Sequence, residues 1–170
     1  MSAQNDIEES VARLGARLAA AGLTVATAES CTGGGVAQAL TAIAGSSAWF
    51  DRGFVTYSNV SKTEMLGVPP QLIDQQGAVS EAVVRAMTQG ALAASAADWV
   101  IAISGIAGPG GGTAEKPVGT VWLAWQQKGG LSSAECAHFQ GDRTLIREQA
   151  VKRALEGLIE RLCGSFNPED

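Results

Sequence analysis

Hydrophobic residues recur with helical spacing near both ends of the chain. Ile7, Val11, Leu14 and Leu18 are separated by four, three and four positions, which places them on one face of a helix that Gly22 would end. Residues 143–162 repeat the pattern and predict a second long amphipathic helix. Its apolar side would comprise Ile146, Ala150, Leu155, Leu158, Ile159 and Leu162.

Short apolar runs between these two helices predict strands. The run DWVIAIS at 98–104 is continuous, as in a strand buried on both faces. KGG at 128–130 would turn the chain between two further strands and form a hairpin. The five predicted strands cover residues 23–28, 53–57, 98–104, 118–126 and 134–140.

The segments between the strands predict further helices. Residues 36–44 would be helical, and residues 60–66 would form a short helix capped by Ser58 or Asn59 and closed by Gly67 and the proline pair at 69–70. A longer Ala-rich helix would cover residues 81–97 after Ser80. Alternating strands and helices predict one α/β domain over residues 1–170, a three-layer α/β/α sandwich with a mixed, mostly parallel sheet.

Composition excludes several classes of protein. Twelve Lys and Arg against seventeen Asp and Glu give a net charge of -5, which argues against a nucleic-acid partner. The chain shows neither a long apolar run nor a signal-peptide pattern, so we expect a cytoplasmic protein with no membrane partner. Three cysteines without a close pair and a single histidine favour neither a disulfide framework nor a metal site.

Glycine is abundant, with 21 residues, and it concentrates after two predicted strands. SCTGGG occupies 30–35 and SGIAGPGGGT occupies 104–113. The carboxyl ends of strands are the usual ligand site of open α/β sheets, and glycine lets backbone N–H groups approach an anion. Neither loop is a standard nucleotide fingerprint. For a single loop of this kind, tight turns explain the glycines about as well as a ligand site does. Two loops at neighbouring strand ends favour a phosphate or small-ligand site.

A serine with a lysine base is the best-supported chemistry. Ser30 lies at a strand-to-helix junction, and Lys62 could activate it if burial lowered the lysine's pKa. Lys62 could instead be a solvated helix lysine, as lysines usually are, and Cys31 is either a rival nucleophile or, as is more common, a small buried residue. His138 lies in a predicted hairpin arm without a GxSxG motif, so a serine triad is poorly supported.

Three other side chains are candidates for the same crevice. Tyr57 ends a predicted strand and could bond substrate or Lys62, or be an ordinary strand aromatic. Arg143 begins the last helix and opposes its dipole, which calls for an anionic ligand or Asp142 as partner. Lys116 either closes over a ligand or is a loop charge.

Several motifs together resemble the CinA C-terminal domain family, in order from the first helix to the last. They are AESCTGG at 28–34, GSSAWF at 45–50, GFVTYSN at 53–59 with Lys62, LGV at 66–68, GAVSE at 77–81, SGIAGP at 104–109 and KPVGTV at 116–121. The chain departs from the family at Ser61, where Ala is frequent, and at Ala82, where Pro is frequent. Full-length CinA proteins also carry a separate N-terminal domain, for which we expect no room in these 170 residues.

The resemblance implies an activity, because the family's stand-alone members are nicotinamide-nucleotide amidohydrolases. It implies hydrolysis of the carboxamide of nicotinamide mononucleotide (NMN) in pyridine-nucleotide recycling, with no metal or cofactor. Ser30 would be the nucleophile, Lys62 its base and Tyr57 a further catalytic residue. Substrate would contact Thr32, Gly33, Gly34, Ser104, Gly105, Gly108 and Arg143. The alternative is a nucleotide-binding module without turnover, and apolar surface on the Ala-rich helix or late hairpin would allow a homodimer.

Overall fold

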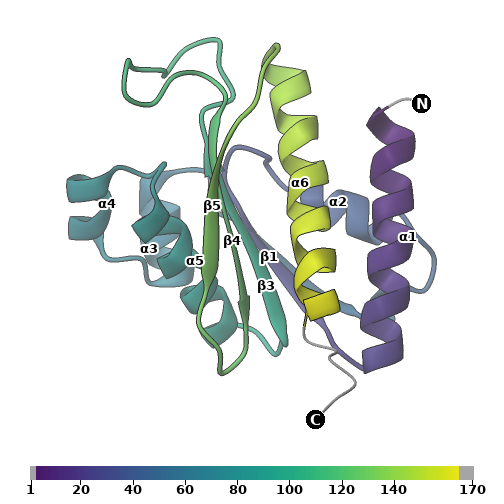
Figure 1. The fold of residues 1–170 in the computed structure, drawn as a ribbon. Coiled ribbons are helices and arrows are strands. Elements are labelled where there is room, and N and C mark those ends of the chain that lie inside the picture. The colour runs from purple at the N-terminus through teal and green to yellow at the C-terminus, as the bar shows by residue number, and fades with distance from the viewer. Residues whose placement is uncertain (1–2, 165–170) are drawn as a thin grey trace.

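The structure, a computed structural model, describes residues 3–164 and contains one five-stranded sheet between two layers of helices (Figure 1). The strand order is β2-β1-β3-β4-β5. β1 pairs in parallel with β2 and β3, whereas β4 is antiparallel to β3 and β5. Four strands therefore point one way, and the predicted fold class is confirmed. The strands are β1 (Val25–Glu29), β2 (Phe50–Val55), β3 (Trp99–Gly105), β4 (Thr120–Gln127) and β5 (Ser133–His138).

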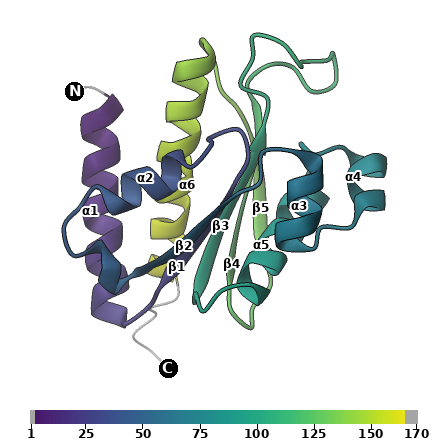
Figure 2. The same ribbon diagram turned by 180° about the vertical axis from the view of Figure 1, so that it is seen from behind.

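Three α-helices lie on each side of the sheet (Figure 2). One layer holds α1 (Ala3–Ala21), α2 (Gly35–Thr41) and α6 (Arg143–Gly164), and the other holds α3 (Asn59–Leu66), α4 (Pro70–Gln76) and α5 (Glu81–Ala93). Within the second layer, α4 packs against α3 and α5. A hydrophobic core lies between the sheet and each layer of helices. The central strand β3 contributes to both, since Ile101 packs in the core of the first layer and Val100 in that of the second. None of the helices in residues 3–164 is long and apolar enough to cross a membrane.

The second layer differs from the sequence prediction at a proline pair. We expected the prolines at 69–70 only to close the preceding helix, but Pro70 is the first residue of α4. Proline is favoured there because the first helical N–H has no partner within the helix. The Ala-rich helix ends at Ala93 rather than at residue 97. The 3-10 turn η1 (Ser46–Ala48) leads into β2, which begins at Phe50 and ends before Tyr57.

The short helix α3 has well-defined ends, as its flanking residues predict. The hydroxyl of Ser58 accepts a hydrogen bond from the amide of Ser61 at 3.1 Å. Gly67 ends the helix with a φ of 66°, a left-handed conformation that favours glycine. These two caps fix which turn of α3 carries Lys62.

Gly90 allows α5 to pack directly against the end of α3. A Cβ atom at position 90 would overlap the backbone oxygen of Leu66, the last residue of α3. Backbone atoms cannot rotate away as a side chain can, so the two helices approach this closely only because residue 90 is glycine. The packing sets how near α3 lies to the sheet.

Gly90→Ala is expected to destabilise the fold by about 1–3 kcal/mol, because the added methyl group forces α3 away from α5. Urea unfolding followed by circular dichroism measures the change. Gly164→Ala is the matched control, since Gly164 is also in a helix and has no heavy atom within 4 Å of an added Cβ. Equal stability of the two variants would contradict the packing argument.

Candidate active site

The two glycine loops begin at adjacent strands, as the sequence predicted. β1 and β3 pair in parallel through Glu29 and Ile103, so Ser30 and Ser104 follow at neighbouring strand ends. The amide of Ser30 donates to the carbonyl of Ile103 at 3.0 Å, which continues the pairing by one residue. The serine hydroxyl therefore lies at the carboxyl edge of the sheet, the edge at which open α/β sheets bind ligands.

Lys62 reaches this edge from α3. Its Nζ lies 3.1 Å from Oγ of Ser30 and donates to the carbonyl of Thr56 at 2.9 Å. Only 1% of Lys62 is exposed, and no acidic side chain in residues 3–164 forms a salt bridge with it. Removal from water disfavours the ammonium form and lowers the pKa of Lys62 below its ordinary value. Burial thus shifts the protonation equilibrium of Lys62 toward the neutral amine, beside a serine hydroxyl.

Cys31, the neighbour of Ser30, has different chemistry. Burial raises the pKa of its thiol to about 11. The thiolate is the reactive form of cysteine, and at neutral pH very little of it is present at such a pKa. Burial thus acts on both residues: it disfavours the ammonium form of Lys62 and the thiolate form of Cys31.

Arg143 connects the segment after β2 to the second glycine loop. Its Nη2 donates to the hydroxyl of Tyr57 at 3.0 Å, and its Nη1 donates to the carbonyl of Gly108 at 2.8 Å. Asp142 instead caps α6, because its Oδ1 accepts from the amide of Leu145 at 2.9 Å. The partners of Arg143 at this helix start are thus a phenol and a carbonyl, and both belong to segments beside Ser30.

A pocket of about 280 Å³ joins these groups and is named here the Ser30 pocket. It lies between the two strand ends, α3 and the start of α6. Asn59 and Val79 add to its lining from the α3–α5 layer. Seven of the predicted site residues line it: Ser30, Tyr57, Lys62, Ser104, Gly105, Gly108 and Arg143.

The other three predicted contacts belong to the first glycine loop and are not among the residues that line the Ser30 pocket. Thr32 donates its hydroxyl to Oε1 of Glu29 at 2.7 Å. The amide of Gly33 donates to the carbonyl of Ser30 at 3.0 Å, which closes a tight turn. Gly33 and Gly34 have φ values of 59° and 97°, so these glycines allow the chain to enter α2. Their observed contacts shape the loop that carries Ser30.

Glu29, the last residue of β1, supports this loop, a role that the sequence analysis missed. It is 1% exposed, and besides the Thr32 hydroxyl it accepts the amides of Val36 at 2.8 Å and Ala37 at 3.0 Å. Those amides belong to the first turn of α2 and have no acceptor within the helix. An acidic residue shortly before a predicted helix start was the signal that could have found it.

Arg147 is the second residue that was missed. Its Nε donates to the carbonyl of Cys31 at 3.0 Å, and its Nη2 donates to the carbonyl of Thr32 at 3.1 Å. It follows Arg143 by four positions, so both arginines lie on one face of α6. That spacing was the available sequence signal.

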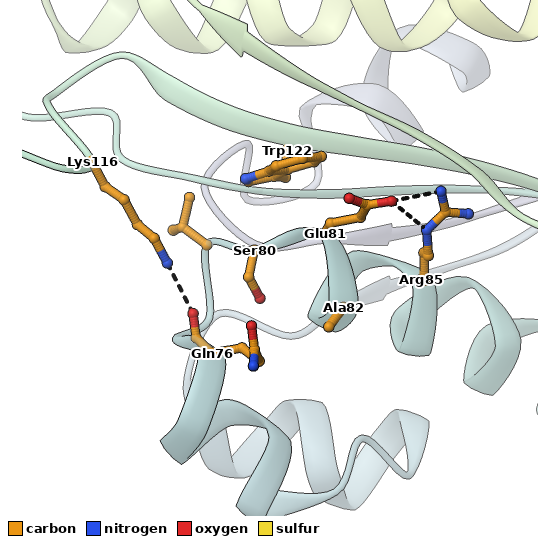
Figure 3. Close-up of a pocket in the computed structure, with 8 residues that line it drawn as sticks. Gln76, Ser80, Glu81, Ala82, Arg85, Lys116 and Trp122 are labelled. Carbon is orange, nitrogen blue, oxygen red and sulfur yellow. Dashed lines mark hydrogen bonds and ion pairs between the residues drawn. The ribbon is translucent and has the colours of Figure 1, made fainter.

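A larger pocket of about 500 Å³ lies beside the start of α5 (Figure 3). It shares Val79 with the Ser30 pocket. Lys116 lies here and donates to the carbonyl of Gln76 at 2.9 Å, while Arg85 pairs with Glu81 at 2.7 Å (Figure 3). Both cations thus already have partners within the fold. Residues 3–164 contain no cluster of three His, Cys, Asp or Glu side chains placed to hold a metal ion.

Known proteins resemble this chain over most of its length. The sequence model described as "CinA C-terminal domain" matches residues 7–162. Nicotinamide-nucleotide amidohydrolase PncC of Pseudomonas putida is 55% identical over 148 residues, covering 87% of this chain and 92% of that protein. PncC of Escherichia coli K12 is 56% identical over 151 residues, covering 88% and 90%. A CinA-like protein of Akkermansia muciniphila is 54% identical, but the match covers only 34% of that longer protein.

Crystal structures show the same arrangement of elements. The competence/damage inducible protein CihA of Agrobacterium tumefaciens superposes with a TM-score of 0.89 at 50% identity, covering 91% of this chain and 94% of that one. A CinA superfamily protein of E. coli gives a TM-score of 0.88 at 40% identity, covering 95% and 94%. Sequence and fold agree along nearly the whole described chain, which therefore belongs to the CinA C-terminal domain family.

Proposed function

We propose that this chain hydrolyses the carboxamide of NMN to nicotinic acid mononucleotide and ammonia, as a step in pyridine-nucleotide recycling. The observation that carries the proposal is the buried Nζ of Lys62, 3.1 Å from the hydroxyl of Ser30 in a pocket of about 280 Å³. The names of the relatives from P. putida and E. coli support the choice of substrate.

Lys62 acts as the general base in this mechanism. A neutral amine can donate one N–H to the carbonyl of Thr56 while its lone pair accepts the proton of the Ser30 hydroxyl. Ser30 Oγ then bonds to the carboxamide carbon, and Lys62 becomes an ammonium. It returns the proton to the leaving nitrogen as the C–N bond breaks. Water, deprotonated in turn by Lys62, cleaves the acyl-enzyme and regenerates Ser30.

Backbone amides of the first glycine loop stabilise the oxyanion formed by this attack. The amide of Ser30 already donates to Ile103, and the amide of Gly33 already donates to Ser30. The amides of Cys31 and Thr32 donate to no carbonyl in residues 3–164, so they are the available donors beside the nucleophile: Cys31 lines the Ser30 pocket and Thr32 is the next residue in the chain. One such donor is typically worth about 3 kcal/mol of transition-state stabilisation. The positive charge of the pyridinium ring further activates the carboxamide.

The phosphate of NMN is bound by Arg143 and the second glycine loop. The guanidinium uses two of its five N–H donors on Tyr57 and Gly108, which leaves donors for an anion. Tyr57 is 59% exposed, so its ring is accessible at the pocket mouth and can order the substrate. Holding the phosphate fixes the ring relative to Ser30 and so contributes to the rate through orientation.

Ser30→Ala is expected to reduce ammonia release from NMN at least about a thousandfold, because Ser30 carries the hydroxyl that is hydrogen-bonded to Lys62. Cys31→Ala is expected to keep the rate within about tenfold of the wild type. The assay is steady-state ammonia release by the purified full chain. A Ser30→Ala enzyme with normal turnover beside an inactive Cys31→Ala enzyme would reverse the assignment. Tight NMN binding by a wild type that releases no ammonia would favour the binding module.

The pH dependence of kcat should report Lys62. Only the neutral amine accepts a proton, so kcat rises as pH increases through the pKa of Lys62, with its midpoint below the ordinary lysine value of about 10.4. Lys62→Met is expected to lower the neutral-pH rate by about 10²–10⁴ and to abolish this rise. Lys116→Met is the control and should keep the wild-type profile. A Lys62→Met enzyme that retains its neutral-pH rate would refute the base assignment.

A further inference from the structure

The first two turns of α6 carry two arginines that hold the two glycine loops. Arg143 bonds to Gly108 in the second loop, and Arg147 bonds to Cys31 and Thr32 in the first. In the described part of the chain no acidic side chain forms a salt bridge with Arg147. The hydrogen bonds of its guanidinium are thus with the backbone that follows Ser30.

These contacts determine the direction of two successive peptide planes. The carbonyl and the N–H of a trans peptide point in opposite directions. Because the carbonyl of Cys31 faces Arg147, the amide of Thr32 faces away from α6. In the next peptide the carbonyl of Thr32 also faces Arg147, so the amide of Gly33 points away from it. That amide donates to the carbonyl of Ser30 and closes the turn.

The remaining polar groups of Thr32 are also occupied. Thr32 is 1% exposed and its hydroxyl is bonded to Glu29, while its carbonyl is bonded to Arg147. Its amide is therefore the one polar group of the residue that still lacks a partner within residues 3–164. A positive charge at the far end of the same peptide polarises it, so the amide becomes a stronger donor.

We propose that Arg147 is a positioning residue of the amidohydrolase reaction: it holds and polarises the peptide between Cys31 and Thr32 so that the amide of Thr32 can stabilise the oxyanion. The proposal rests on the proposed function. Arg147 is not among the residues that line the Ser30 pocket, and its hydrogen bonds are to backbone carbonyls, so it acts through the backbone. Its removal therefore affects the transition state, in which the oxyanion exists, more than the bound substrate.

The test compares Arg147→Met and Arg147→Lys with the wild type in ammonia release from NMN. Arg147→Met is expected to lower kcat about tenfold to a hundredfold, less than the loss of a whole oxyanion donor, with KM within about threefold. Arg147→Lys keeps the charge but loses the paired donors, so its kcat should fall between those of the other two enzymes. The pH midpoint of kcat should stay at the wild-type position, because Lys62 is untouched.

Arg153→Met is the matched control on the same helix. Arg153 pairs with Glu135 and Glu160 rather than with the loop, so its loss removes ion pairs without moving the Ser30 peptide. Urea unfolding of each variant identifies any kcat loss that follows only from lower stability. A kcat of Arg147→Met within twofold of the wild type, or a loss equal to that of Arg153→Met, overturns the proposal.

Two further outcomes are decisive. If Arg147→Met does not fold, Arg147→Lys decides: a kcat at least threefold below the wild type with an unchanged KM supports the proposal, and a wild-type kcat overturns it. If the wild type releases no ammonia from NMN, the proposed function fails and this proposal fails with it. An active wild type with an unaffected Arg147→Met enzyme refutes only the positioning role.

Discussion

The arrangement of this fold depends on keeping one amine out of water. Lys62 extends from α3 to the sheet, where the carbonyl of Thr56 and the hydroxyl of Ser30 replace its hydration. An ammonium so placed is costly, and no carboxylate in residues 3–164 forms a salt bridge with it, so the pKa of Lys62 is lowered. The caps of α3 fix the turn that carries Lys62, and the close packing at Gly90 fixes its depth. The caps of α3 and the packing at Gly90 therefore hold Lys62 in the buried position that lowers its pKa.

Hydrophobic periodicity predicted the elements whose burial pattern is strong. α1 and α6 have apolar stripes at helical spacing, and the continuous run of β3 is buried on both faces as expected. The prediction failed at α4 because a proline that ends one helix can also begin the next. It misplaced β2 by a few residues because that strand is at the sheet edge, is largely exposed and has little apolar pattern.

The candidate site was predictable where a residue type carries chemistry by itself. A serine after a strand, a lysine near it and an arginine that opposes a helix dipole all suggested a role, and the fold brings Ser30, Lys62 and Arg143 to one pocket. The roles of Glu29 and Arg147 were not predicted because most of their partners are backbone groups, which no side-chain pattern encodes. The catalytic roles, the homodimer, the absence of a nucleic-acid partner and the cytoplasmic location stay predictions.

The position of α6 in the chain has a consequence for biosynthesis. Ribosomes make β1, α3 and both glycine loops before they make α6, which holds those loops through Arg143 and Arg147. α1 also depends on α6 for its packing, because the two helices lie side by side (Figure 1) and belong to the same hydrophobic core. Nζ of Lys152 on α6 and Oδ2 of Asp6 on α1 form an ion pair at 2.9 Å. Until α6 emerges, the nascent chain exposes the apolar face of α1, a surface prone to aggregation and suited to chaperone binding. Orientation of Ser30 and burial of the first helix are therefore completed together, once α6 has been made.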